Sequence, residues 1–309
     1  MEKVRVGIIG VGYLGTHHAR VLSYLGEAEL KGVADIDFKK AVEIGNRHGV
    51  KYYQKYEDML EEIDAAIVAT PTSEHFPITM HLLREGKSVL VEKPLTETVE
   101  QGEELVSLAN KNGIVLRAGH LERFNPAVEV LEDLITEPKF IEAERLGSFS
   151  SRSLDINVVL DLMIHDLDII LSLIKDEVSH IRSSGIHVLS EKIDIAHARL
   201  EFKSGCVANL TASRVHQGKV RKLRIFEPTS YYSVDYINQE VSIFPLNGRQ
   251  ADIKTLKIKK EEPLKKELQS FFLSIRDKKP RKVSGEEGLR ALKLAYEVLG
   301  KAEKSNHEK

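Results

Sequence analysis

Apolar positions in the first 120 residues follow two alternating patterns. Short β-forming runs, such as Val4–Ile9 and Ala65–Ala69, are separated by segments whose apolar residues recur every three or four positions. The short runs predict strands buried on both faces, and the spaced segments predict amphipathic helices. Repeated strand–helix units of this length predict a doubly wound parallel sheet over residues 1–120, with right-handed crossovers.

The pattern changes after about residue 120. Residues 158–174 carry apolar side chains at helical spacing, whereas residues 196–202 and 206–212 alternate between apolar and polar, joined by a hairpin at Lys203–Gly205. We therefore expect a second, α+β domain over residues 121–309, with a mostly antiparallel open sheet. Its small apolar side chains suit one face to covering helices; the other face is either solvated or packed on a second subunit.

A glycine-rich turn links the first predicted strand to the first predicted helix. The run Gly10-Val11-Gly12-Tyr13-Leu14-Gly15 has the spacing Gly-x-Gly-x-x-Gly. Such a turn exposes backbone N–H groups at a positive helix end, where a pyrophosphate can bind. The alternative is a tight turn that binds no ligand.

Asp35 closes the second predicted strand, about twenty residues beyond the glycines, where an acidic residue can bind the adenosine ribose hydroxyls. Its charge would repel a ribose 2′-phosphate, so we expect NAD as the cofactor. Lys39 and Lys40 lie about one helical turn on and leave some room for NADP as the second choice.

Other strand ends should meet the glycine turn in one crevice, because ligands of such sheets lie beyond the carboxyl ends of the strands. The residues concerned are Thr70-Pro71-Thr72 with His75, and Glu92-Lys93-Pro94. We expect these residues to contact the cofactor. For His75 the alternative is a residue near a helix N-terminus without a ligand.

Lys93 is the first candidate for chemistry. It follows a buried strand and precedes a proline, which biases its backbone to an extended conformation. A lysine at this crevice can donate a hydrogen bond to a reacting oxygen and contact both cofactor and substrate. The alternative is a solvated surface lysine.

Asp161 and His165 are the second candidate. They are four residues apart in the predicted helix, so their side chains share one face. A carboxylate there can orient the imidazole, which can take a proton from an alcohol as hydride leaves its carbon. The alternative is a pair that only caps or solvates the helix. A metal site is not expected, because no third ligand stands at a recognisable spacing.

Arg123 and Asn125 stand where the first predicted sheet ends. Both are suited to binding substrate hydroxyls, a phosphate or the cofactor amide; a structural hinge is the alternative. A basic cluster on a later alternating strand is interpreted as solvated surface or subunit interface. Its members are Lys219, Arg221, Lys222 and Arg224.

Composition narrows the classes of function. The 309 residues carry a net charge of -2, which argues against a nucleic-acid or anionic-membrane binder. No apolar run approaches a membrane span, and the N-terminus enters a strand without a signal-like segment. The single cysteine, Cys206, excludes an internal disulfide and suits a small buried residue. We expect a cytoplasmic protein.

Together these motifs resemble the glucose–fructose oxidoreductase / inositol dehydrogenase (Gfo/Idh/MocA) family over nearly the whole chain. The resemblance rests on the glycine turn, Asp35, Thr70-Pro71 with His75, Glu92-Lys93-Pro94, and Asp161-x-x-x-His165-Asp166. It implies a Rossmann domain, an open-sheet α/β domain, and transfer of hydride from a sugar or cyclitol hydroxyl to nicotinamide. It also implies that Lys93 polarises or shares a proton with the substrate, that Asp161 orients substrate and His165, and that His165 is the acid/base.

Two further features refine the resemblance. Many family members have glycines just before the helix motif, where this chain has Asn157-Val158-Val159-Leu160, and we count Asn157 among the substrate contacts. The run Gly119–Ala127, together with Asp161–Asp166, looks most similar to members that oxidise the 3-hydroxyl of UDP-N-acetylglucosamine. The family also implies a homodimer or homotetramer formed through the second-domain sheet.

The expected function is therefore NAD-dependent oxidation of a sugar or nucleotide-sugar hydroxyl. The alternatives are an inositol or free-sugar dehydrogenase, a reductase of a non-sugar ligand, and a cofactor-binding regulator that kept the fold without catalysis. Lys93, Asp161 and His165 are all present, which favours an enzyme.

Overall fold

The computed structural model describes residues 3–149, 156–246, 253–278 and 282–307. The chain forms two compact units. The first contains Met1–Leu121 and Glu262–Leu289, and the second contains Glu122–Glu261 and Arg290–Lys309.

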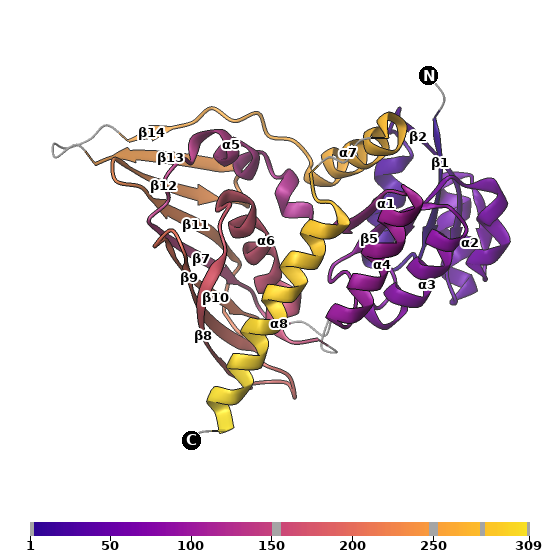
Figure 1. The fold of residues 1–309 in the computed structure, drawn as a ribbon. Helices are drawn as coiled ribbons and strands as arrows, with labels where there is room; N and C mark the ends of the chain where they lie inside the picture. Colours follow the sequence, from indigo (N-terminus) through magenta and orange to yellow (C-terminus); the bar gives the residue numbers. More distant parts are fainter. Residues whose placement is uncertain (1–2, 150–155, 247–252, 279–281, 308–309) are drawn as a thin grey trace. The chain divides into compact units, whose positions relative to one another are not determined.

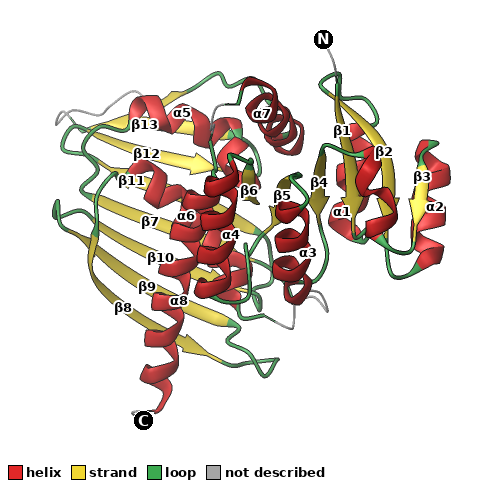
Figure 2. Ribbon diagram, turned by 45° about the vertical axis from the view of Figure 1, so that its right-hand side comes forward, coloured by secondary structure: helices red, strands yellow, loops and turns green. Residues whose placement is uncertain are grey.

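The first unit combines helices with a sheet (Figure 1). The sheet is parallel and six-stranded with the order β3-β2-β1-β4-β5-β6, which confirms the predicted doubly wound class (Figure 2). The order reverses between β1 and β4, and such a switch point opens a crevice at the carboxyl ends of the strands. The strands are β1 (Val4–Ile9), β2 (Ala28–Ala34), β3 (Lys51–Tyr53), β4 (Ala65–Val68), β5 (Ser88–Glu92) and β6 (Leu116–Gly119).

The helices that connect these strands are α1 (Tyr13–Leu22), α2 (Phe38–His48), the 3₁₀ helix η1 (Tyr56–Glu62), α3 (Thr72–Arg84) and α4 (Val99–Asn112). Helix α1 packs against α2, and α3 packs against α4. The sequence predicts the last strand at residues 114–116, whereas β6 begins at Leu116. The reason is the left-handed Gly113 at the end of α4, after which Ile114 still donates its N–H to the carbonyl of Ala109.

Helix α7 (Pro263–Asp277) belongs to the first unit, although the predicted boundary assigned it to residues 121–309. Its apolar side chains Leu268, Phe271 and Phe272 are buried in one core with residues of β1, β2 and α1. A boundary drawn from the change of pattern near residue 120 misses this return, because the chain re-enters the first unit about 140 residues later.

The second unit is an eight-stranded sheet with the order β14-β13-β12-β11-β7-β10-β9-β8. All neighbours are antiparallel except β7 and β10, so the predicted mostly antiparallel sheet is confirmed. The strands are β7 (Phe140–Leu146), β8 (Val178–Ile186), β9 (Ile195–Phe202), β10 (Val207–Ser213), β11 (Val220–Phe226), β12 (Ser230–Asp235), β13 (Glu240–Pro245) and β14 (Lys254–Thr255).

Helices cover one face of this sheet (Figure 2). Strand residues with alternating burial, such as Ala208, Leu210 and Ala212, point into the covered face. The helices are η2 (Leu121–Phe124), α5 (Pro126–Leu134), the π-helix η3 (Val159–Met163), α6 (Ile164–Leu173) and α8 (Gly285–His307). Within the described residues, no helix combines the length and the apolar character that crossing a bilayer requires.

Candidate active site

The three glycines after β1 are required for three different reasons. Gly10 has φ +84°, and a Cβ there would lie 2.6 Å from the Ala69 carbonyl oxygen. A Cβ on Gly15 would lie 1.9 Å from the Gly10 oxygen, so only glycine lets α1 approach β1 this closely. A Cβ on Gly12 would meet nothing within 4 Å. The turn is therefore compact on its inner side and open at Gly12, where a pyrophosphate would approach.

The start of α1 is suited to an anion. Gly12 gives the helix no side-chain cap, and the first turn holds no acidic residue, so nothing in it competes for the N–H groups. Tyr13 and Leu14 are 60% and 40% exposed. These residues fit the pyrophosphate of a dinucleotide and leave apolar surface beside it.

Asp35 ties the end of β2 to the glycine turn. Its carboxylate accepts hydrogen bonds from the Val11 and Asp37 N–H groups, each at 2.9 Å. A negative charge held beside the turn disfavours a second phosphate there, which fits NAD better than NADP.

His75 lies inside the first unit and is 1% exposed. Its Nδ1 is 2.8 Å from the Pro94 carbonyl oxygen, and its Nε2 is 3.0 Å from the Thr70 oxygen. Burial lowers the pKa of His75, and a neutral imidazole donates to one carbonyl at a time. His75 therefore links the turn at Thr70-Pro71-Thr72 to the turn after β5. These contacts fit the alternative in which His75 has no ligand.

Glu92, the last residue of β5, forms a buried pair with His18 of α1, whose Nε2 donates to the carboxylate at 2.8 Å. Burial acts to raise the pKa of Glu92, but the hydrogen bond from His18 and the charges of His18 and Lys93 outweigh it and lower that pKa. Gly119 of β6 makes room for the carboxylate, since a Cβ there would lie 2.9 Å from it. Lys93 is half-buried directly after this anchored residue, and its peptide bond to Pro94 is cis.

Glu267 of α7 is another buried acid, and sequence analysis missed it. It is 1% exposed, and neither carboxyl oxygen has a hydrogen-bond partner among the described residues. Burial, together with the negative charge of Glu92, raises the pKa of Glu267 well above its usual value, although Arg117 opposes this. The sequence itself indicates that Glu267 is buried, because its position lies on the apolar helix face that Leu264, Leu268 and Phe271 define.

In the second unit, Asn157 begins the helical segment that carries Asp161 and His165. Its side-chain oxygen accepts hydrogen bonds from the Val159 and Leu160 N–H groups, both at 3.0 Å. The sequence predicts a regular helix from residue 158, but residues 159–163 form a π-helix before α6 begins. Asp161 therefore lies in a wider turn than its four-residue spacing from His165 implies; both side chains are partly exposed. Short π-helical segments are frequent at functional sites.

Asp166, the neighbour of His165, is anchored in the covered face of the sheet. Arg145 of β7 donates to both Asp166 oxygens at 2.8 Å and to Glu122 at 2.9 Å. Burial acts to lower the pKa of Arg145, but the charges of Asp166 and Glu122 prevail and raise it. The guanidinium also lies 5.4 Å from the centroid of the Tyr236 ring. This ion pair fixes the start of α6 to β7.

Arg123 and Asn125 face internal partners in the second unit. Arg123 is 5% exposed and lies 3.5 Å from Asp168. Asn125 caps α5 by accepting the Ala127 N–H, and it donates to the Tyr236 carbonyl. These contacts favour the structural alternative over ligand binding for both residues.

The described residues contain no group of three or more His, Cys, Asp or Glu placed to hold a metal ion. Burial raises the pKa of the Cys206 thiol to about 11, so it stays protonated at neutral pH and is no nucleophile.

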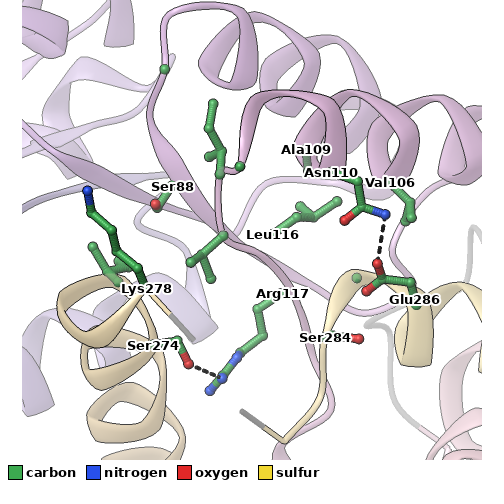
Figure 3. A pocket seen from close by; sticks show the side chains of 16 residues that line it. Ser88, Val106, Ala109, Asn110, Leu116, Arg117, Ser274, Lys278, Ser284 and Glu286 are labelled. Carbon is green, nitrogen blue, oxygen red and sulfur yellow. Dashed lines mark hydrogen bonds between the residues drawn. The ribbon is translucent and has the colours of Figure 1, made fainter. Parts of the chain in front are cut away.

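A cavity of about 470 Å³ lies elsewhere in the first unit (Figure 3). It is lined by the first residues of β5 and β6, Ser88 and Leu116, and by Ser274 and Glu286. It therefore lies at the amino ends of these strands, opposite the glycine turn. Arg117 donates to Ser274 there, and Asn110 donates to Glu286.

Replacing Gly12 or Gly15 by alanine should separate cofactor binding from folding. Gly12→Ala leaves the thermal midpoint nearly unchanged, because the new Cβ meets nothing, but it weakens NAD binding about tenfold or more by filling the phosphate approach. Gly15→Ala lowers the unfolding free energy by about 1–3 kcal/mol, because its Cβ overlaps the Gly10 oxygen. Thermal unfolding and NADH fluorescence titration measure the two effects; unaltered NADH affinity in Gly12→Ala would contradict this assignment.

Glu267→Gln should change how stability depends on pH. Because the folded pKa of Glu267 is raised, the folded protein keeps a proton that the unfolded chain loses above its pKa of about 4.3. The contribution of Glu267 to stability then falls as pH rises, by up to about 1.4 kcal/mol per pH unit, and the glutamine variant does not have this pH-dependent loss. Urea unfolding from pH 4 to pH 7 should show that the unfolding free energy of Glu267→Gln increasingly exceeds that of the wild type. Glu85→Gln, at an exposed position, should show no such difference. Parallel stability curves would contradict the buried neutral acid.

Comparison with known proteins agrees with this geometry. Residues 4–120 match the oxidoreductase family with an NAD-binding Rossmann fold, and residues 138–227 match the Gfo/Idh/MocA C-terminal domain. The UDP-N-acetylglucosamine 3-dehydrogenase of Acidithiobacillus ferrooxidans is 35% identical over 305 residues, covering 96% of this chain and 97% of that protein. The myo-inositol 2-dehydrogenase of Thermotoga maritima is 26% identical, covering 99% and 97%.

Solved structures show the same fold. A structure of the A. ferrooxidans enzyme has a TM-score of 0.93 and covers 98% of this chain and 99% of its own. The scyllo-inositol dehydrogenase of Lactobacillus casei, solved with NAD(H) and scyllo-inositol, has a TM-score of 0.82 at 18% identity, with 98% of each chain covered. The predicted family, dehydrogenase activity and NAD cofactor are therefore confirmed. This chain belongs to the Gfo/Idh/MocA family of oxidoreductases, and its first unit is an NAD-binding Rossmann domain.

Proposed function

We propose that this oxidoreductase acts on a nucleotide sugar and oxidises the 3-hydroxyl of UDP-N-acetylglucosamine. One observation carries the proposal: the 35% identity to the A. ferrooxidans UDP-N-acetylglucosamine 3-dehydrogenase extends over 96% of this chain. The identity to the T. maritima inositol dehydrogenase is 26% over a similar length. An inositol is therefore the second candidate substrate.

In this proposal Lys93, Asp161 and His165 have the roles that the family resemblance implies. Lys93 donates a hydrogen bond to the reacting oxygen, and its position after the anchored Glu92 supports this role. His165 accepts the hydroxyl proton, and Asp161 binds the substrate and orients His165. Bound NAD supplies the acceptor for the hydride that leaves the same carbon. Asn157 remains a proposed substrate contact at the start of the π-helix.

Lys93→Met should abolish turnover while NADH still binds. We expect kcat with UDP-N-acetylglucosamine and NAD to fall about 10²- to 10⁴-fold, because a group that donates to the reacting oxygen is lost. Lys55→Met is the matched control, since Lys55 is an exposed lysine of the same unit. NADH absorbance measures turnover, and fluorescence titration measures binding.

The same assay tests the substrate against its rivals. Myo-inositol, scyllo-inositol and free N-acetylglucosamine are compared with the UDP-sugar in the wild-type protein. Turnover of an inositol but not of the UDP-sugar would overturn the proposed substrate, and full activity of Lys93→Met would overturn the role of the lysine. NADH binding without turnover of any of these would favour a cofactor-binding regulator.

We further propose a cytoplasmic homodimer or homotetramer that assembles through the open face of the eight-stranded sheet. A row of aromatic side chains on that face supports the assembly. Phe140, Phe226, Tyr231 and Phe244 come from four neighbouring strands, with successive ring centroids 5.8, 4.6 and 4.8 Å apart. Each is half-buried in the single chain, and a partly exposed aromatic row of this kind is typical of an interface. The single buried cysteine suits a reducing compartment.

Tyr231→Asp should shift the protein toward the monomer, because it places a charge in the centre of the aromatic row. Light scattering coupled to size exclusion measures the mass, and circular dichroism checks the fold. Ile237→Asp is the control, since Ile237 is 51% exposed in the same unit but lies outside the row. A monomeric wild-type protein would refute the assembly, and an unchanged mass for Tyr231→Asp would refute the face.

A further inference from the structure

The sequence predicts Arg221 on a solvated surface or a subunit interface, but its side chain lies on the helix-covered face of the sheet. Along β11, Leu223 and Ile225 are buried in the covered face, and Arg221 has their parity. Lys222 and Arg224 have the opposite parity and lie on the open face, where Lys222 is exposed and Arg224 pairs with Glu142. The basic cluster is therefore divided between the two faces of the sheet.

Within the described residues, Arg221 donates its hydrogen bonds through Nη1 alone. Its Nη1 donates to the carbonyl oxygens of Leu146 at 2.7 Å and Val220 at 2.9 Å. In the described part of the chain no carboxylate forms an ion pair with it. Two other arginines near these strand ends differ, because Arg145 is paired with Asp166 and Arg214 with Asp194.

The charge of Arg221 is poorly compensated. Burial lowers the pKa of Arg221 to about 10, and the positive charge of Arg145 adds to this effect. The carboxylates of Asp166, Glu122 and Asp161 act in the opposite direction without restoring the usual value. The guanidinium remains charged at neutral pH, but it is partly desolvated and has no ion-pair partner among the residues that the structure describes. A bound anion would supply the missing compensation.

A glycine lies beside the Arg221 guanidinium. Gly147, the residue after β7, has no side chain, and a Cβ there would lie 3.8 Å from Arg221 Nη2. The π-helix that carries Asp161 packs against β10, the parallel neighbour of β7. Arg221 pairs in register with Arg145 of β7, which pairs in turn with Ala212 of β10, so Arg221 lies two strands from the strand that this π-helix contacts.

We propose that Arg221 binds a phosphoryl group of the substrate and thereby selects a nucleotide sugar over a neutral sugar or cyclitol. The inference rests on the proposed function and names the group that distinguishes its candidate substrates. A guanidinium presents paired N–H donors that match phosphate oxygens, and Nε and Nη2 are the donors that Arg221 has left.

The test compares Arg221→Gln and Arg221→Lys with the wild type. With UDP-N-acetylglucosamine, Arg221→Gln should raise KM about 10- to 100-fold with a smaller effect on kcat, and lysine should restore part of the loss. At saturating NADH, which fills the cofactor site, UDP should bind Arg221→Gln about 10- to 100-fold more weakly by calorimetry. Turnover of the neutral methyl glycoside of N-acetylglucosamine should be the same in both proteins. Lys222→Gln, on the same strand but the opposite face, is the matched control.

The outcomes separate this inference from the proposed function. Equal losses with the UDP-sugar and the methyl glycoside would overturn it, since Arg221 would then recognise the sugar or its acetamido group. UDP binding that is unchanged in Arg221→Gln, with an unchanged thermal midpoint, would also overturn it. If the wild type binds UDP through Arg221 but does not oxidise the UDP-sugar, the proposed reaction fails and the phosphoryl site stands.

Discussion

The buried hydrogen bond between His18 and Glu92 is the contact on which the first unit depends most. It joins α1, whose N-terminus is the expected pyrophosphate site, to the end of β5, where Lys93 follows. Removing one partner of this buried hydrogen bond leaves the other polar group unsatisfied and costs about 1–3 kcal/mol. Glu267 and Gly119 share this environment: one keeps a neutral carboxyl near the charge of Glu92, and the other leaves it room. The position of Lys93 is therefore set by groups that do not themselves react.

In the second unit, too, a proposed reactive residue lies next to an anchored residue in the chain. Asp166 is held by two hydrogen bonds from Arg145, and His165 is its neighbour in the chain. In both units the proposed reactive side chain adjoins a residue anchored in a buried ion pair. Anchoring the neighbouring residue fixes the backbone from which the proposed reactive side chain projects, which helps to preorganise a site.

Local patterns in the sequence predict the strands, the glycine turn and the class of both sheets, because strand burial and turn geometry depend on near neighbours. They cannot show that residues 262–289 return to the first unit or that residues 159–163 form a π-helix, since tertiary packing decides both. Arg123, Asn125 and His75 have residue types suited to ligands, yet internal partners occupy them. For Arg221 the residue type misleads in the other direction. The alternation of β11 places Arg221 on the same face as Leu223 and Ile225, but the neighbouring basic residues led to the prediction of a solvated surface or subunit interface.

The difference between Arg145 and Arg221 shows how burial and function can be told apart. Both side chains belong to the covered face of one sheet, and burial acts against the charge of each. At Arg145 the nearby carboxylates more than restore the charged form, as expected where an ion pair stabilises the fold. At Arg221 they do not, and its hydrogen bonds within the described residues go to two backbone carbonyls rather than to a carboxylate. A buried-face guanidinium that forms no ion pair within the described residues fits a ligand that supplies the counter-charge, because functional sites are where local rules of stability are broken.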